Sequence, residues 1–529
     1  MATARTLALL VLSAALTSSC SGTKDVPVKG VAAADAAADA LWIDSQLSNL
    51  KSDVAAVKDA AAQPDAASDQ TSAPELDVVA PFDAAPTAGL WWRQFGVAKS
   101  PLRLGPVAVD SQGRVIVTGG CNSPVDMGIA VTQTGTGFAF LFAAAYAPDG
   151  TPLWARRFGM SSSHSAITAV AIGASDQIYL TGHFQGGPLD FGSGPLANAA
   201  GSSNNTTDIF VAALNPNGEA LWALRTGGDS WDFAGGLAVA ADGHVVAAAQ
   251  VSGHLQVLWL EPGGALQQTV TSPGYVSINA AFKSVVNHVA IDAAHNAYVV
   301  GTVSGAPTDW GAGATAKSKF QQGFVLSYAA AGGALRWSQM IPTTVGNSVV
   351  GSGASVRSIV VAGDGLVVAG DFPGQIELGG GALTAGTTHG QISGFVERLR
   401  AADGGHIWSY GLGDGSSIRG LALAASGDPV VAVVASKPVV FPGLALSTLG
   451  AHLVAVDALT GAALQDRDLA DIAPAAVWAK NRLAAVAAGP NGEWLLPVGL
   501  VSAQKYGFAA LVPIYSDGLI VRLIDRMGA

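Results

Sequence analysis

Charged residues are scarce in this sequence. Asp, Glu, Lys and Arg make up only 12% of its 529 residues, and the net charge at pH 7 is −11. Proteins that bind nucleic acid carry a clustered footprint of Lys and Arg, and no such cluster occurs here. We therefore expect no nucleic-acid partner.

Cysteine is nearly absent, with Cys20 and Cys121 as the only two. Small exported domains that depend on disulfides carry more cysteines than this. Stability must therefore come from a hydrophobic core, for which the 50% hydrophobic content is sufficient. We interpret Cys121 as a small buried residue at a strand end rather than as a nucleophile.

The short motifs of common catalytic and cofactor sites are also missing. The sequence has no GxSxG, no P-loop and no GxGxxG between a strand and a helix. Its nine histidines show no zinc spacing such as HExxH. We predict no catalytic, cofactor or metal site from motifs, although residues from distant repeats could still form a hydrolytic site.

Residues 1–20 have the features of an export signal. Arg5 precedes an apolar run, residues 7–16, that is too short to span a bilayer. Leu16-Thr-Ser-Ser-Cys20 resembles the bacterial lipobox, although Thr17 stands where that family has Leu. The resemblance implies that lipid on Cys20 attaches the protein to a membrane, and Ser21 after it implies sorting to the outer membrane. An ordinary cleaved signal is the alternative.

Residues 21–88 differ from the rest of the chain. They are rich in Ala, Asp, Ser and Pro, hold eleven acidic and four basic residues, and are predicted to form a disordered tether. Within residues 36–62, apolar positions spaced 4, 3, 4, 3 predict a short helix. This stretch resembles the heptads of the small trimeric murein lipoprotein. Because about three heptads are marginal for a coiled coil, we favour a solitary helix and a monomer over an oligomeric stalk.

Two hairpin patterns recur after residue 88. One is FVAALNPNGEALWALRTGG (210–228), in which Asn-Gly interrupts alternating apolar residues, a strong hairpin signal. The other is strand, tight turn, strand, as in VAIDAAHNAYVVGTV (289–303). Together they supply four strands per repeat, and four-stranded units at this period indicate a β-propeller. Seven turns of the second pattern are predicted, near Gly113, Asp176, Gly243, Asn296, Gly365, Gly427 and Gly492.

The two ends of this region are complementary. Residues 90–96 (LWWRQFG) match the fourth strand of a repeat, LWARRFG (153–159), but no first three strands precede them. Residues 517–529 match a third strand without a fourth. We predict an all-β, seven-bladed propeller over residues 89–529, closed by the N-terminal strand beside the strand around Ile520.

The blade pattern is VAxDxxGxxxVTGxF, then xxDFGxG, then DxFVAxLxxxGxxLW. It is similar to the seven-bladed propeller repeats common in large bacterial exported proteins. The resemblance implies a fold but not a function, because propellers host many activities. The GxxLW ending also resembles quinoprotein-like repeats, including those of the propeller lipoprotein that assists outer-membrane protein assembly, although those repeats are nearer to about forty residues.

Two sets of side chains recur at fixed positions. We interpret the fourth-strand tryptophans as apolar wedges between blades rather than as a stacking platform. We interpret Asp190 and Asp309, which start the DFG-like loops, as loop hydrogen-bond acceptors, because one acid per loop is too few for calcium. Long loops lie at one end of the blades, so Asp190, Trp231, Asp309 and Trp310 mark the predicted binding face.

These patterns favour an exported outer-membrane lipoprotein whose propeller acts as a non-catalytic binding or assembly scaffold. A protein or a glycan would bind to the long-loop face. One alternative is the quinoprotein-like lipoprotein that assists outer-membrane protein assembly. The other is an exported polysaccharide hydrolase or lyase, which would need carboxylates or histidines converging at one channel mouth.

Overall fold

We describe the protein from a computed structural model. The chain divides into two compact units, Met1–Ala80 and Pro81–Ala529, and the described residues all belong to the second. The predicted export signal, Cys20 and the tether with its helix lie outside the described residues. No helix in the described part of the chain is long and apolar enough to cross a membrane. The described residues are 90–95, 102–121, 127–134, 139–160, 164–199, 206–276, 285–344, 353–385, 392–470 and the strands within 482–524.

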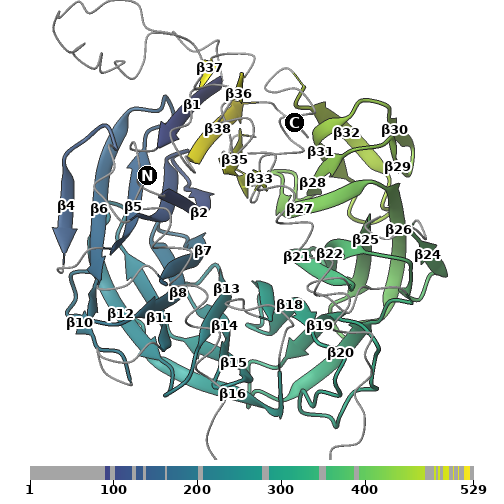
Figure 1. The fold of residues 1–529 in the computed structure, drawn as a ribbon, viewed down its shortest axis with the longest axis horizontal. Coiled ribbons are helices and arrows are strands. Elements are labelled where there is room, and N and C mark those ends of the chain that lie inside the picture. Colours follow the sequence, from purple (N-terminus) through teal and green to yellow (C-terminus); the bar gives the residue numbers. More distant parts are fainter. Residues whose placement is uncertain are drawn as a thin grey trace, which may run out of the picture. The chain divides into compact units, whose positions relative to one another are not determined.

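The second unit is all-β and has the sheet architecture of a β-propeller (Figure 1). Its described strands form seven sheets of four or five strands and four two-stranded ribbons. In hydrogen-bonded order, sheet 1 consists of β2 (Leu102–Val109), β3 (Val115–Cys121), β5 (Ala139–Tyr146), β6 (Pro152–Met160) and β4 (Val131–Thr134). Sheet 2 consists of β7 (Ala166–Ile172), β8 (Ile178–Gln185), β11 (Thr207–Leu214) and β12 (Ala220–Thr226). Sheet 3 consists of β13 (Phe233–Val239), β14 (Val245–Val251), β15 (His254–Leu260) and β16 (Leu266–Tyr275).

The remaining sheets repeat this order. They are sheet 4, β17 (Val286–Ile291), β18 (Ala297–Val303), β19 (Gln322–Tyr328) and β20 (Leu335–Ile341); sheet 5, β21 (Ser355–Ala362), β22 (Gly365–Phe372), β25 (Ser393–Arg400) and β26 (His406–Asp414); sheet 6, β27 (Ser416–Leu423), β28 (Pro429–Ala435), β31 (Gly450–Val456) and β32 (Ala463–Asp468); and sheet 7, β33 (Arg482–Leu483), β35 (Glu493–Gly499), β38 (Gly518–Ile524) and β1 (Leu90–Phe95), with β34 (Ala487–Ala488) also on β35.

The hairpin turns follow from their sequences. Asn215 Oδ1 accepts hydrogen bonds from the backbone N–H of Asn217 and of Glu219, at 2.9 and 3.0 Å. Gly218, at φ 76°, occupies the left-handed position that a side chain would strain. β11 and β12 pair antiparallel on either side of this turn, which confirms the predicted hairpin.

A glycine of the second strand allows close packing in four sheets. A Cβ on Gly182 would lie 2.0 Å from the carbonyl oxygen of Ala166 and 2.6 Å from the ring of Phe210. The second strand therefore needs glycine beneath the Phe of the third strand. The same arrangement pairs Gly119 with Phe142, Gly301 with Phe324 and Gly370 with Phe395.

Neighbouring sheets bury a shared core. Between sheets 2 and 3, for example, Tyr179 and Val211 pack with Leu237 and Leu258. Four tryptophans of the fourth strands join the same interfaces, because each indole N–H donates to a carbonyl in a turn of the following sheet. This agrees with the wedge interpretation for Trp154, Trp337 and Trp408, whereas Trp222 also lines a surface cavity. These donors and acceptors are Trp154 to Pro216 (2.9 Å), Trp222 to Pro262 (3.1 Å), Trp337 to Ala401 (3.1 Å) and Trp408 to Ala458 (3.3 Å).

The first strands connect the sheets in a regular order. β7 contacts β2 and β13, β17 contacts β13 and β21, and β27 contacts β21 and β34. Figure 1 shows the sheets of this unit following one another in chain order, with first strands innermost and fourth strands toward the outside; in sheet 1, β4 lies beyond β6. β2 in turn contacts β35 and β38 of sheet 7.

The N-terminal strand lies where the repeat pattern predicts. β1 pairs antiparallel with β38, with Leu90 opposite Leu523 and Arg93 opposite Ile520. β38 continues to β35 on its other side. Sheet 7 is therefore assembled from the two ends of the propeller region.

The structure also departs from the sequence prediction. β4 adds a fifth strand to sheet 1, parallel to β6, within a segment predicted to be a loop. Three of the ribbons lie within loops between second and third strands: β9 (Leu189–Asp190) with β10 (Pro195–Leu196), β23 (Gln375–Glu377) with β24 (Ala382–Thr384), and β29 (Val439–Phe441) with β30 (Leu444–Leu446). The fourth ribbon pairs β36 (Gln504–Lys505) with β37 (Ala510–Leu511).

Two turns are centred one or two residues before the positions near which the sequence predicts them. In sheet 5 the turn contains only Gly363 and Asp364, so Gly363 takes positive φ and Gly365 begins β22. In sheet 4 the left-handed residue is His295 rather than Asn296. The reason is that Asp292 Oδ1 accepts the backbone N–H of Asn296, which fixes the turn one residue earlier.

Candidate functional site

Asp190 and Asp309 hold equivalent loops together. Asp190 Oδ1 accepts the backbone N–H groups of Gly192 and Gly194, at 2.7 and 3.2 Å. Asp309 Oδ1 does the same for Gly311 and Gly313, at 2.8 and 2.9 Å. Both carboxylates therefore stabilise their own loops, as the interpretation of loop hydrogen bonding predicts.

The two tryptophans predicted on the long-loop face are engaged in packing. Trp310 is 2% exposed, its ring lies 5.0 Å from that of Phe324, and its carbonyl oxygen accepts the hydroxyl of Tyr328. Trp231 is half-buried and stacks on Phe233. Trp310 therefore belongs to the core, and of the two only Trp231 has an exposed part.

The cysteine outside the signal lies where the sequence predicts. Cys121 ends β3, is 4% exposed, and packs in the core of sheet 1 with Val115, Phe140 and Phe142. Its burial among apolar side chains supports the structural interpretation.

A cavity of about 400 Å³ opens at the other end of the sheets, between the short turns of sheets 2 and 3. Two aromatic rings form part of its wall, Tyr179 and Trp222, whose centroids are 6.1 Å apart. Burial raises the pKa of Tyr179, so its hydroxyl is neutral at pH 7. The other lining residues are Ala174, Ser175, Gln177, Leu221, Ala241, Asp242, Gly243, Pro262 and Gly263.

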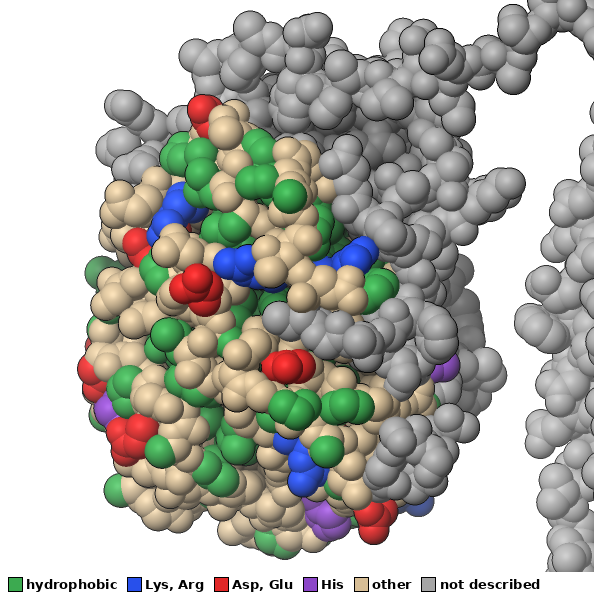
Figure 2. Space-filling model, turned by 90° about the vertical axis from the view of Figure 1, so that its left-hand side faces the viewer, with side chains coloured by type: hydrophobic (Ala, Val, Ile, Leu, Met, Phe, Trp, Pro, Cys, Tyr) green, Lys and Arg blue, Asp and Glu red, His purple; other side chains and the backbone are tan. Residues whose placement is uncertain are grey.

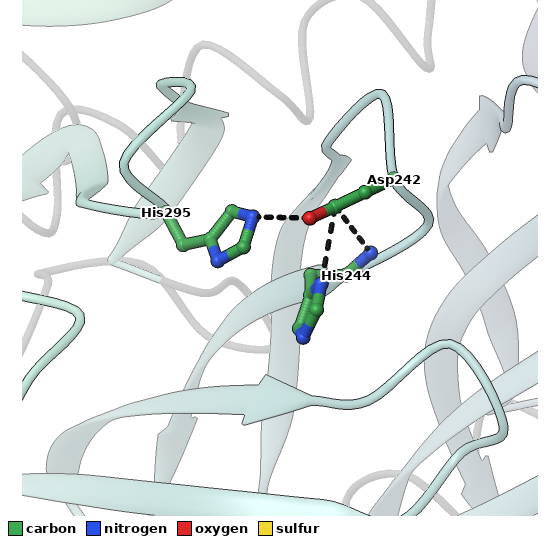
Figure 3. Close-up of side chains that lie close together, drawn as sticks. All are labelled: Asp242, His244 and His295. Atoms are coloured by element: carbon green, nitrogen blue, oxygen red, sulfur yellow. Dashed lines mark hydrogen bonds and ion pairs between the residues drawn. The ribbon is translucent and has the colours of Figure 1, made fainter.

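Asp242 also belongs to a group of titratable side chains beside this cavity (Figure 3). Its carboxylate contacts two imidazoles, with Oδ2 2.8 Å from Nε2 of His295 and Oδ1 3.1 Å from Nδ1 of His244. The two imidazole rings stack with their centroids 4.2 Å apart. Nε2 of His244 lies 3.0 Å from Oε2 of Glu261. We call these four residues the His-Asp cluster.

Short turns of two neighbouring sheets position the His-Asp cluster. Asp242 and His244 flank Gly243 in the turn between β13 and β14. In this turn the backbone N–H of Ala240 donates to the carbonyl of His244, and that of Gly243 donates to the carbonyl of Ala240. His295 lies in the corresponding turn between β17 and β18. Its φ of 60° is unusual for a residue with a side chain, and its carbonyl oxygen accepts the indole N–H of buried Trp259 at 2.9 Å.

The charges of the cluster favour an ionised Asp242. Partial desolvation acts to raise the pKa of this carboxyl, but the hydrogen bond from the backbone N–H of His244 and the neighbouring imidazoles of His295 and His244 outweigh it and lower the pKa to about 2. The carboxylate is therefore available as an anionic ligand or acceptor at neutral pH. Donor atoms of Asp242, His244 and His295 lie within 4.8 Å of one another, so the three residues could hold a metal ion.

Sequence motifs did not reveal this cluster. Asp242 and His295 are far apart in sequence, and each is an ordinary polar turn residue when its own repeat is considered alone. The one available signal is the alignment of the turns, in which His295 occupies the left-handed position that Gly113, Gly243 and Gly427 fill in other sheets.

The surface of the propeller unit shows no concentrated positive charge on the face in Figure 2. Lys and Arg side chains are scattered there among Asp, Glu and uncharged residues of the described part of the chain.

No protein-family model and no curated protein sequence matches this chain. Among solved structures, a chain from the mitotic checkpoint complex is 11% identical, with a TM-score of 0.43, and the alignment covers 87% of this chain and 99% of that one. The Pan2 WD40 domain of Neurospora crassa is 8% identical, with a TM-score of 0.39 and coverages of 82% and 96%. A streptogramin B lyase is 8% identical, with a TM-score of 0.38 and coverages of 82% and 98%. Likenesses this distant carry no argument about function.

Proposed function

We propose that the chain is an exported lipoprotein whose closed, seven-bladed propeller is a rigid binding scaffold. The observation that carries the proposal is the sheet order: seven sheets contact one another in sequence, β2 of sheet 1 contacts sheet 7, and β1 pairs with β38. A ring joined by its two terminal segments has few exposed sheet edges. It can hold surface turns from different blades at fixed positions.

The binding site of this scaffold is the cavity between the short turns of sheets 2 and 3. Tyr179, Trp222 and Leu221 offer apolar surface, whereas Ser175 and Gln177 offer hydrogen-bonding groups at its edge. A sugar ring presents the matching chemistry, because it has an apolar face and a rim of hydroxyls. We propose a glycan unit as the ligand, bound on the short-turn face rather than on the long-loop face.

The cavity supports binding rather than glycan cleavage. Glycoside hydrolysis uses a pair of carboxyl groups on either side of the scissile bond. Among the described residues that line the cavity, Asp242 is the single acidic side chain. The proposed role is therefore recognition without turnover.

A glycan array probed with the full-length mature protein tests the ligand. We expect a saccharide bound by the wild type to be lost or weakened at least about 10-fold in a Ser175→Ala, Gln177→Ala double variant, since each lost hydrogen bond contributes about 1 kcal/mol. Ser426→Ala is the matched control, because Ser426 holds the corresponding turn position in sheet 6, where its hydroxyl bonds Asp428 at 2.9 Å. Equal binding by all three proteins would contradict the proposed site.

Anchoring is tested separately. Cys20→Ser removes the thiol that would carry the lipid, and we expect this variant to leave the membrane fraction and to incorporate no labelled fatty acid. Stable attachment requires more than one acyl chain, so partial loss of lipid should also release the protein. Membrane retention of the unlabelled Cys20→Ser variant would refute lipid anchoring and leave the propeller proposal intact.

A further inference from the structure

We propose that the His-Asp cluster is a binding site for one divalent transition-metal ion of the zinc class, held between sheets 3 and 4. Asp242 would provide a carboxylate oxygen, His244 its Nδ1 and His295 its Nε2. This inference goes beyond the glycan proposal: Asp242 also lines the glycan cavity, but His244, His295 and Glu261 do not.

The donor set has the chemistry that zinc-class ions prefer. Two imidazole nitrogens and one carboxylate oxygen are common ligands of these ions, at about 2.0 to 2.2 Å. Ligand atoms of a tetrahedral site with such bonds lie about 3.4 Å apart. The three residues already place their donor atoms within 4.8 Å of one another, and both imidazoles already contact the same carboxylate at 3.1 Å or less. Small side-chain rotations would complete the site.

The contact between His244 and Asp242 is poorly suited to a hydrogen bond. Nδ1 of His244 lies 3.1 Å from Oδ1 of Asp242 but has no hydrogen-bond partner of acceptable geometry among the described residues. This nitrogen is buried from solvent. A ring nitrogen held next to a carboxylate without a shared hydrogen bond is free to offer its lone pair to a cation.

Glu261 occupies the position of an outer partner. A metal-binding histidine usually donates its other ring N–H to a carboxylate, which orients the ring and makes it a stronger ligand. Nε2 of His244 lies 3.0 Å from Oε2 of Glu261. Binding through Nδ1 would therefore leave Nε2–H to donate to Glu261. Three protein ligands would leave a fourth position for water or for another ligand, which is the arrangement of zinc sites with an open coordination position.

A neighbouring pair of turns shows that contact between sheets does not require histidine. Asp176, at φ 61°, occupies in sheet 2 the same turn position as His295 in sheet 4. Its carboxylate binds the hydroxyl and backbone N–H of Ser111 in sheet 1 and lies 3.6 Å from Arg114. That contact carries hydrogen bonds and an ion pair but no ring nitrogen. Between sheets 3 and 4 the same position instead brings an imidazole to an acid and a second imidazole.

Equilibrium dialysis of the full-length mature protein without an affinity tag, against Zn²⁺, tests the site. We expect one tightly bound equivalent in the wild type. His295→Asn should weaken binding by at least about 100-fold, while the turn is retained because Asn tolerates positive φ. Glu261→Gln should weaken it by about 10 to 100-fold. Asp176→Asn is the matched control and should bind as the wild type does.

The visible absorption of bound Co²⁺ distinguishes a metal site from a cluster with only a structural role. Co²⁺ bound by the wild type should give the intense visible absorption of a tetrahedral site, and His295→Asn should lose it. The proposal would be overturned if no metal ion bound at a saturable site. It would also be overturned by an adventitious ion only, seen as several weakly bound ions that His295→Asn does not affect. Equal losses of metal binding in His295→Asn and Asp176→Asn would overturn it as well. Circular dichroism of each variant verifies that it is folded.

Discussion

Glu397 provides a sharp test of the packing between sheets 4 and 5. This side chain of β25 is fully buried. Its Oε1 accepts a hydrogen bond from Nε2 of Gln339 in β20, at 3.0 Å, while Oε2 has no hydrogen-bond partner among the described residues. Burial, only partly offset by the bond from Gln339, raises the pKa of Glu397 from 4.5 to about 8. The carboxyl is therefore protonated in the folded protein at neutral pH.

The effect on stability has a definite sign. Between pH 4.5 and about pH 8 the folded protein holds a proton on Glu397 that the unfolded chain has released. The contribution of this group to stability is therefore complete below pH 4.5 and is lost as pH rises through about 8. At about 1.4 kcal/mol per pK unit, the loss is of the order of 5 kcal/mol.

Glu397→Gln removes the titration while it keeps the shape of the side chain. We expect the free energy of unfolding of this variant, relative to wild type, to rise by roughly 1 kcal/mol for each pH unit between pH 5 and pH 8. Urea unfolding followed by tryptophan fluorescence at several pH values measures it. Glu219→Gln, the same substitution at an exposed turn position, is the control for a general effect of removing one carboxyl group. Parallel pH profiles for wild type and Glu397→Gln would refute the reasoning.

Two further predictions concern packing and charge. Gly182→Ala should destabilise the protein by about 3 kcal/mol or more in urea unfolding, because its methyl group would collide with Phe210 and a backbone carbonyl. The control is Gly263→Ala, whose methyl group would meet nothing within 4 Å and which should change stability by less than about 0.5 kcal/mol. Equal effects of the two substitutions would contradict this explanation. Asp466→Asn should destabilise the protein more at pH 5.5 than at pH 9. Burial alone lowers the pKa of His452, but the carboxylate of Asp466, 3.1 Å from its Nδ1, raises the pKa overall. The ion pair of His452 with Asp466 is therefore present at low pH and is lost as pH rises. A destabilisation that does not change with pH would show that His452 is neutral throughout.

The hairpins were predictable because their signals are local. Asn217-Gly218 sets its own turn by hydrogen bonds within five residues. The pairing of β1 with β38 was predictable for a different reason, since a repeat pattern with a missing fourth strand has one available partner. Both inferences needed only the order of strands within a repeat.

The His-Asp cluster was not predictable in this way. Asp242 and His295 meet only because sheets 3 and 4 pack face to face, and the register between two sheets depends on core contacts such as that of Trp259 with the His295 turn. The tight packing of Trp310 was missed for a different reason, because this loop residue packs on Phe324 and Tyr328 of its own sheet. Contacts between repeats depend on three-dimensional packing, which strand periodicity does not encode.

The pairing of β1 with β38 has a mechanical consequence. Any tension transmitted along the chain from residues before Leu90 enters the propeller unit through β1, and six residue pairs join that strand to β38. These hydrogen bonds would bear the load before those of any other sheet. Rupture of this one pairing would separate sheet 7 into its two contributing chain ends.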